Sequence, residues 1–190
     1  MSPPSSTLID ALTEFHQHSY HWALTCCQQR ESEALDVLQE AYVLVLGDHV
    51  TYSEESSLKT WFFGVIKNIA FQNGRRVRRR LKILQSAFTR SLTDHTHILS
   101  SNLSNRPDHQ LLYQEMQSHV EQALKHLSGG QKRIIHLVFY QGLTLEESAQ
   151  VLGLSVGTVR THYARAKAKL SKRLSDHYVP LLGAERTSNS

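Results

Sequence analysis

Apolar residues recur three and four positions apart along most of this chain. That spacing places them on one face of an α-helix, the face that a folded protein buries. The four prolines lie outside the interior of every helix that the pattern predicts. The pattern therefore predicts an all-α protein, with helices over residues 8–29 and 31–46, a helix that begins at residue 58 and carries a polar face to residue 79, a helix over 108–127 and a pair of helices over 143–174.

The segment 143–174 has the clearest boundaries. Leu145, Ala149 and Leu152 form an apolar stripe that ends at Gly153. Glycine adopts the positive φ of a tight turn, and Ser155 can cap the helix that follows. The segment is therefore predicted to be a helix-turn-helix.

The second helix of this pair is strongly basic. It carries six lysines and arginines between Arg160 and Arg173, and no acidic residue. Such a surface is complementary to phosphate, although a solvated amphipathic helix is an alternative. The turn and the charge together favour DNA binding.

Composition indicates two small domains rather than one large one. The chain has 190 residues, of which 40% are hydrophobic, with a net charge of +4. Residues 1–60 hold nine acids and two bases, whereas residues 61–90 hold eight bases and no acid. This asymmetry predicts one surface for a protein partner and another for nucleic acid. No apolar run is long enough to cross a bilayer, and the N-terminus does not resemble a signal peptide, so a cytoplasmic protein without membrane insertion is expected.

Two adjacent cysteines and a group of histidines suggest a metal or thiol sensor as a minor alternative. The residues are Cys26, Cys27, His16, His18 and His21. On a helix, His18 and His21 share a face that His16 does not, and no second ligand pair has the spacing of a zinc site. No metal and no cofactor are therefore expected.

The predicted helix over residues 31–46 has an acidic patch. Asp36, Gln39 and Glu40 share a face with Val43. Taken alone, the patch is typical of a solvated helix face, and no nucleophile, pocket or metal set accompanies it to indicate an enzyme. The other face is an apolar stripe that is expected to be buried, formed by Leu35, Leu38, Tyr42, Val45 and Leu46.

A polar surface loop over residues 47–57 leads into the next helix. One face of that helix is polar and basic, since asparagine and glutamine can pair with adenine edges and arginine with phosphate or guanine. A basic segment that only caps the domain is the alternative. Gly74 is expected to let the helix fray where the arginines begin. The polar face comprises Asn68, Gln72, Arg75, Arg76 and Arg79.

The remaining segments join and support these helices. Residues 86–108 have the composition of a linker. The helix over residues 108–127 is expected to end at Ser128-Gly129-Gly130, and the apolar segment 131–140 to support the helix-turn-helix.

In this order, the motifs resemble those of a bacterial extracytoplasmic-function sigma factor, a specificity subunit of RNA polymerase. The resemblance is carried by EALDVLQE at residues 33–40, LKTWFFGVIKNIA at 58–70, GLTLEESA at 142–149 and SVGTVRT at 155–161. It implies two helical domains, the second a helix-turn-helix domain, and no enzymatic activity. The implied division is 1–80 for polymerase binding and minus-ten recognition, 81–107 for the linker, 108–176 for minus-thirty-five recognition, and 177–190 for a flexible tail.

The resemblance also implies partners and contact residues. Asp36, Gln39 and Glu40 match the family's contact with core RNA polymerase, although the family usually has an acid where Leu35 stands. Promoter DNA is the second partner. An anti-sigma factor is a further expected partner, because such control is common in the family.

Within the first domain, the resemblance assigns the minus-ten element to the loop and the basic helix. Tyr52 and Val65 would form the wall around an extruded base. Trp61 would be structural and Asn68 would face bases. The other implied minus-ten residues are Gln72, Arg75, Arg76 and Arg79.

Within the second domain, the resemblance assigns the minus-thirty-five element to the second helix of the pair. Thr161 and Arg165 match positions that meet bases, and Thr158 and Arg160 match positions near phosphates. His162 stands where arginine is common, and Ala164 replaces a larger side chain. Both departures are expected to alter the preferred promoter sequence.

The main alternative is an operator-binding regulator whose N-terminal half senses a signal or binds a partner. The DNA-binding output domains of response regulators contain motifs similar to LGLSVGTVRTH. Such a regulator has no use for the segment over residues 61–80.

Overall fold

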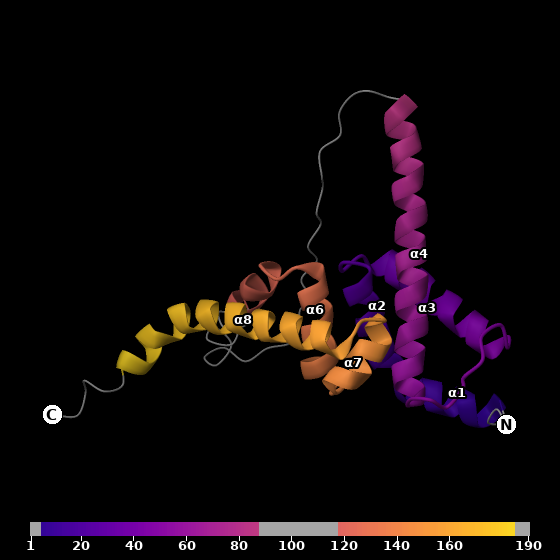
Figure 1. Ribbon diagram of the computed structural model, residues 1–190, viewed down its shortest axis with the longest axis horizontal. Coiled ribbons are helices and arrows are strands. Elements are labelled where there is room, and N and C mark those ends of the chain that lie inside the picture. Colours follow the sequence, from indigo (N-terminus) through magenta and orange to yellow (C-terminus); the bar gives the residue numbers. More distant parts are fainter. Residues whose placement is uncertain (1–4, 88–117, 185–190) are drawn as a thin grey trace, which may run out of the picture. The chain divides into compact units, whose positions relative to one another are not determined.

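The structure is a computed structural model that describes residues 5–87 and 118–184 (Figure 1). Every regular element in these ranges is helical, so the predicted all-α class is confirmed there. The N-terminal elements are α1 (Ser5–Glu14), α2 (His16–Cys26), α3 (Glu31–Leu46) and α4 (Leu58–Ala87). After a helical stretch at 118–125 come α6 (Gly129–Ile135), the π-helix η1 (His136–Tyr140), α7 (Leu145–Leu152) and α8 (Val156–Ala184).

The chain forms two compact units, and the division does not follow the order of the sequence. The first unit combines Met1–Ile98 with His136–Val156, and the second combines Leu99–Ile135 with Gly157–Ser190. One boundary therefore falls inside the helix-turn-helix segment. The domain limits implied by the resemblance stay a prediction.

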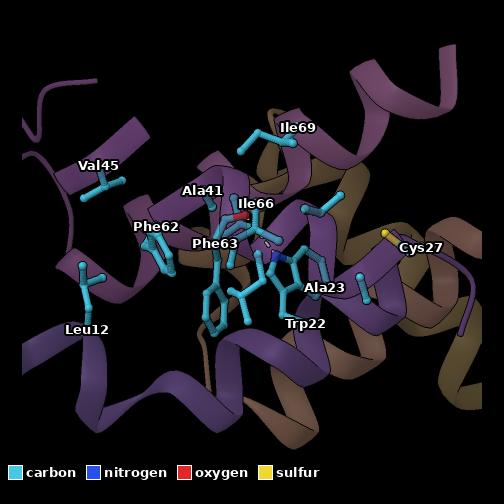
Figure 2. Packing of buried hydrophobic residues seen from close by; sticks show 14 of the residues in the cluster. Leu12, Trp22, Ala23, Cys27, Ala41, Val45, Phe62, Phe63, Ile66 and Ile69 are labelled. Carbon is cyan, nitrogen blue, oxygen red and sulfur yellow. Dashed lines mark hydrogen bonds between the residues drawn. The ribbon is translucent and has the colours of Figure 1, made fainter. Parts of the chain in front are cut away.

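An aromatic core holds the first unit together. Trp22 on α2 and three residues of α4, Phe62, Phe63 and Ile66, are fully buried in it (Figure 2). The indole N–H of Trp22 donates to the carbonyl oxygen of Phe63 at 2.9 Å, so its one polar group is satisfied inside the core. Helices α2, α3 and α4 all pack against one another.

Helix α3 turns a different face to this core than the apolar pattern indicates. Leu35 and Leu46, expected to be buried, are each 47% exposed, so that part of the prediction is wrong. Two alanines let neighbouring helices approach closely, and this favours a buried face that runs beside the larger leucines. The buried residues are Ala34, Val37, Leu38, Ala41 and Val45.

Helix α4 is continuous through Gly74. It runs 30 residues to Ala87, so the expected fraying at Gly74 does not occur, and the helix enters the segment expected to be linker. A single glycine costs a helix about 1 kcal/mol, which an extended run of helix-forming arginines can offset. The arginines are thereby displayed on a regular helix.

The glycine pair near residue 130 starts a helix rather than ending one. The Oγ of Ser128 accepts from the backbone N–H of Gln131 at 3.3 Å, and Gln131 Oε1 accepts from the Ser128 N–H at 3.1 Å. This reciprocal pair caps the N-terminus of α6. The prediction that Gly129 and Gly130 terminate the preceding helix is wrong, because that helix has already ended at residue 125.

The second unit has a small core built on one stripe of α8. Ala166 is fully buried with Leu127 and Ile135, and the half-buried Leu124, Tyr163 and Leu170 pack around them. Helix α8 continues past Pro180 to Ala184, beyond the expected start of the tail at residue 177. Among the described residues, none of the helices combines the length and apolar character that crossing a membrane requires.

Candidate nucleic-acid and protein interfaces

The predicted turn at Gly153 is present, and α7 also begins with a cap that the sequence pattern did not predict. Thr144 Oγ1 accepts from the N–H of Glu147 at 3.1 Å, and Glu147 Oε2 accepts from the N–H of Thr144 at 2.9 Å, which caps α7 at its start. Gly153 ends α7 in the left-handed conformation, with φ 65° and ψ 40°. Helix α8 begins three residues later, at Val156.

The proposed reading residues lie at the N-terminal end of α8. Arg160, Thr161 and Arg165 are exposed, while Thr158 and His162 are partly buried. The hydroxyl of Thr161 donates to the Gly157 carbonyl at 2.9 Å, and its oxygen still has lone pairs to accept another hydrogen bond. These side chains are therefore accessible to a DNA duplex. They also lie at the end of a helix that can enter a major groove.

The polar face of α4 is accessible along its length. All five predicted residues of this face are exposed, and the helix continues from the core into a stretch rich in arginine, from Arg75 to Arg80. No acidic residue occurs between residues 61 and 90. The helix thus presents an uncompensated positive surface, with two exposed apolar side chains, Val77 and Leu81, among the arginines.

The loop before α4 is fixed by local hydrogen bonds. Ser57 Oγ accepts from the Thr60 N–H at 3.2 Å and so caps α4. Tyr52 donates its hydroxyl proton to the Ser56 carbonyl, and its ring lies 5.3 Å from that of Trp61, centroid to centroid. The structure therefore brings Tyr52 and Trp61 together, while Val65 packs against the edge of the core.

Helix α3 displays a mixed acidic and apolar surface. Asp36, Gln39 and Glu40 are exposed as predicted, and Glu40 Oε2 accepts from Asn73 Nδ2 on α4 at 3.2 Å. Val43, 65% exposed, and Leu35 lie on the same side of the helix. We call these five residues of α3 the α3 patch. The apolar pattern alone missed Leu35, because a leucine at helical spacing reads as core.

A shallow apolar pocket adjoins the α3 patch. It encloses about 220 Å³ between α1, α2 and α3. The apolar pattern of the sequence does not predict this pocket, because half of its lining residues also fit a buried helix stripe. Its lining is Ile9, Leu12, Thr13, His16, Tyr42 and Leu46.

Comparison with known proteins shows which protein family this chain resembles. Residues 119–170 match the family model for sigma-70, region 4. Two curated relatives come from Bacillus subtilis. The extracytoplasmic-function sigma factor SigX is 26% identical over 163 residues, covering 84% of this chain and 79% of SigX. The sigma factor SigV is 29% identical over 159 residues, covering 84% of this chain and 86% of SigV.

The chain resembles extracytoplasmic-function sigma factors of RNA polymerase. The resemblance predicted from the motifs is thereby confirmed, and it supports a role as a sigma factor, a class of protein that is not enzymatic. The fold agrees: the sigma factor RpoE from Bartonella quintana, solved in complex with the anti-sigma factor NepR, matches with a TM-score of 0.64. That match has 21% identity and covers 89% of this chain and 97% of RpoE.

The cysteines and histidines that suggested a metal or thiol sensor lie within the described residues. Within residues 5–87 and 118–184, no three His, Cys, Asp or Glu side chains are grouped so that they could hold an ion. Cys27 is buried, and burial, with a smaller effect of Glu33, raises the pKa of its thiol to about 11. His16 instead pairs with Tyr42, Nδ1 to hydroxyl oxygen, at 2.9 Å.

Proposed function

We propose that the protein is an extracytoplasmic-function sigma factor that directs core RNA polymerase to specific promoters and takes part in initiation. The observation that carries the proposal is one chain with both a capped helix-turn-helix matching region 4 and, ahead of it, a long basic helix with an exposed Asn-Gln-Arg face. An operator-binding regulator needs only the first of these. We place the protein in the cytoplasm, where core polymerase acts.

The α3 patch is the proposed contact with core polymerase. Exposed apolar side chains at the centre of a patch supply affinity, whereas the surrounding carboxylates steer and orient a basic partner. Leu35 and Val43 would supply the apolar part, and Asp36, Gln39 and Glu40 the polar part. The exposure of Leu35 offsets the missing acid at that position by adding apolar area.

Helix α4 and the loop before it are the proposed minus-ten reader. Asn68 and Gln72 can each make bidentate hydrogen bonds to adenine, and Arg75, Arg76 and Arg79 can hold phosphates. The pairing of Tyr52 with Trp61 supports an aromatic surface on which an unpaired base can stack, with Val65 beside it.

Helix α8 is the proposed minus-thirty-five reader. Arg165 and Thr161 would face base edges, with Arg160 and Thr158 near phosphates. His162 is half-buried and shorter than the usual arginine, so we expect weaker phosphate contact there and altered base preference. The two readers would fall in the proposed domains 1–80 and 108–176, joined by 81–107 and followed by the tail 177–190.

Tethering both readers to polymerase converts the second DNA contact into an intramolecular one, which raises its effective concentration. An anti-sigma factor is a further proposed partner. Its support is the solved complex of the sigma factor RpoE with NepR, which shares this fold.

The deciding experiment is reconstituted transcription. Purified core polymerase, with and without the full-length protein, is supplied with fragmented genomic DNA from the source organism, and the 5′ ends of transcripts are sequenced. We expect defined start sites that need the protein. Specific DNA binding by the protein alone, with no protein-dependent transcript, would instead favour the operator-binding regulator.

The roles of the two surfaces can be separated by variants. The pair Gln39→Ala with Glu40→Ala should weaken holoenzyme formation while leaving binding to a minus-thirty-five duplex unchanged. Arg165→Ala should do the reverse, with a loss of about 1–3 kcal/mol in duplex binding. Lys125→Ala, on an exposed site outside both surfaces, is the control. Loss of both activities in either variant would mean misfolding rather than a separable role.

A further inference from the structure

The apolar face of α4 continues beyond the core that buries its first half. Ile66 is fully buried, and Val77 lies eleven residues further along, which is about three turns at about 3.6 residues per turn. Leu81 follows Val77 by one turn on the same side. Figure 1 shows this half of α4 extending beyond α1, α2 and α3. Val77 and Leu81 are 49% and 50% exposed there, although they continue a buried stripe.

A notch at Gly74 lies beside these two side chains. Gly74 precedes Val77 by three residues and Leu81 by seven, so the three residues share one side of α4. A Cβ at Gly74 would meet nothing within 4 Å, so the space above its backbone is open. Glycine disfavours a helix interior, but it lets another backbone approach closely. We call Gly74, Val77 and Leu81 the distal stripe.

Arginines border the distal stripe on both sides. Arg78 directly follows Val77 and Arg80 directly precedes Leu81, so each lies about 100° around the helix from its neighbour, in opposite directions. Both arginines are exposed, and the chain has no acidic residue between residues 61 and 90 to offset them. An apolar centre with a cationic rim is complementary to an amphipathic helix that has acidic edges.

The distal stripe faces away from the proposed minus-ten face. Val77 and Asn68 are nine residues apart, about two and a half turns, so they lie on opposite sides of α4. A nucleic-acid strand held by Asn68 and Gln72 would therefore leave the distal stripe uncovered. The aliphatic side chains of the stripe also cannot form hydrogen bonds with a base or a phosphate. The stripe is thus a surface separate from the proposed DNA contact.

A protein helix fits this surface better than a lipid bilayer does. Basic amphipathic helices lie on anionic membranes through a face of bulky apolar side chains. The distal stripe has only two such side chains, and its notch gives a fluid bilayer no advantage. A helix, in contrast, packs its own ridge of side chains into such a groove. From Gly74 to Leu81 the stripe is about 10 Å long, which is about the diameter of one crossing helix.

We propose that the distal stripe is a docking site for an acidic amphipathic helix of a second protein, which binds α4 while the opposite face reads DNA. The partner's apolar side chains would cover Val77 and Leu81, and its backbone would pass close to Gly74. Its carboxylates would pair with Arg78 and Arg80. The docking site rests on α4 itself, and only the simultaneous reading of DNA rests on the proposed function.

The first experiment identifies the partner by photo-crosslinking in the source organism. Leu81 of the full-length protein is replaced with the apolar photo-crosslinker p-benzoylphenylalanine. In a control protein, Arg79 on the minus-ten face is replaced instead. Adducts formed on irradiation are mapped by mass spectrometry. We expect the first protein to form an adduct with a helix of another protein that has acidic residues beside an apolar face, and the control to lack that adduct.

The second experiment measures the affinity of that purified partner for the full-length chain. Val77→Ser with Leu81→Ser should weaken binding about tenfold or more, because the apolar contact is lost. Gly74→Leu should weaken it by a similar factor, because it fills the notch while keeping the stripe apolar. Arg78→Gln with Arg80→Gln should weaken binding about threefold and reduce its dependence on salt.

The matched control is Asn68→Ala with Gln72→Ala, two changes on the opposite face of α4. This variant should bind the partner as the wild type does, but its holoenzyme should lose affinity for a promoter found by the transcription experiment. Val77→Ser with Leu81→Ser should show the reverse. Circular dichroism checks that every variant is folded, which the exposure of the changed side chains favours.

An adduct at Leu81 with nucleic acid or lipid alone, or with this chain itself, would overturn the docking site, and so would the absence of any adduct. Equal affinity of the partner for the wild type and for Val77→Ser with Leu81→Ser would also overturn it. A partner that promoter DNA displaces would overturn simultaneous binding. If the protein starts no transcript with core polymerase, the proposed function fails, while the crosslinks and affinities still decide the docking site.

Discussion

Trp22 connects three elements of the first unit. Its ring lies 6.0 Å from that of Phe63 on α4 and 5.6 Å from that of His136 on η1, and its N–H is bonded to the Phe63 carbonyl. The apolar spacing of α2 marks Trp22 as a core residue. The partner of its N–H lies 41 positions away, so no local pattern could supply it.

Replacing Trp22 with phenylalanine should lower the free energy of unfolding by about 1–3 kcal/mol, because it removes a buried hydrogen bond and leaves a void. Chemical denaturation followed by circular dichroism measures the loss. Trp61→Phe is the matched control, since Trp61 is only partly buried. Equal losses in both variants would contradict the central role of Trp22.

Cys27 should resist modification. It is 4% exposed, and burial raises the pKa of its thiol to about 11, so thiolate is scarce at neutral pH. We expect iodoacetamide at pH 8 to label the native protein at the partly buried Cys26 well before Cys27. Peptide mass spectrometry distinguishes the two sites. Rapid labelling of Cys27 would restore the thiol-sensor alternative that the sequence left open.

At the scale of elements, α4 shows where helix propensity is a weak guide. Gly74 marks a break by propensity alone, yet the helix continues because neighbouring residues favour it and the core anchors its first half. Helix α3 shows a related limit. Its periodicity predicts a buried face, but the choice between neighbouring faces depends on how closely α2 and α4 approach.

Replacing Gly74 and replacing Gly153 with alanine should have opposite effects on the stability of the protein. At Gly74, a Cβ would meet nothing within 4 Å, so Gly74→Ala should stabilise the protein by about 0.5–1 kcal/mol. At Gly153, φ is +65°, so Gly153→Ala should destabilise it by about 1–2 kcal/mol. Urea denaturation of both variants gives the comparison. A destabilising Gly74→Ala would argue against a continuous α4.

For the whole molecule, stability should depend on pH through His136. Its pKa is about 4 in the folded protein and near 6.5 when unfolded, so its contribution is present above pH 6.5 and is lost as pH falls towards 4. About 2 kcal/mol should be lost between pH 7.5 and 5. The slope of unfolding free energy against pH measures this, and His136→Asn should reduce that slope.

His126→Asn, at an exposed histidine, is the control and should keep the wild-type slope. A slope unaltered by His136→Asn would mean that other groups dominate the acid response of the protein.

The sequence by itself determined the features that depend on residues a few positions apart. These are the helical segments, the turn at Gly153 and the opposite charges of α3 and α4. The sigma-factor resemblance could be predicted because its motifs are local and ordered. Only the tertiary structure decided that Leu35 faces solvent and that Gln141 forms hydrogen bonds to His18 on α2 and Lys59 on α4. The bond between His18 and Gln141 joins residues 123 positions apart, and such a contact depends on how helices pack rather than on any local pattern.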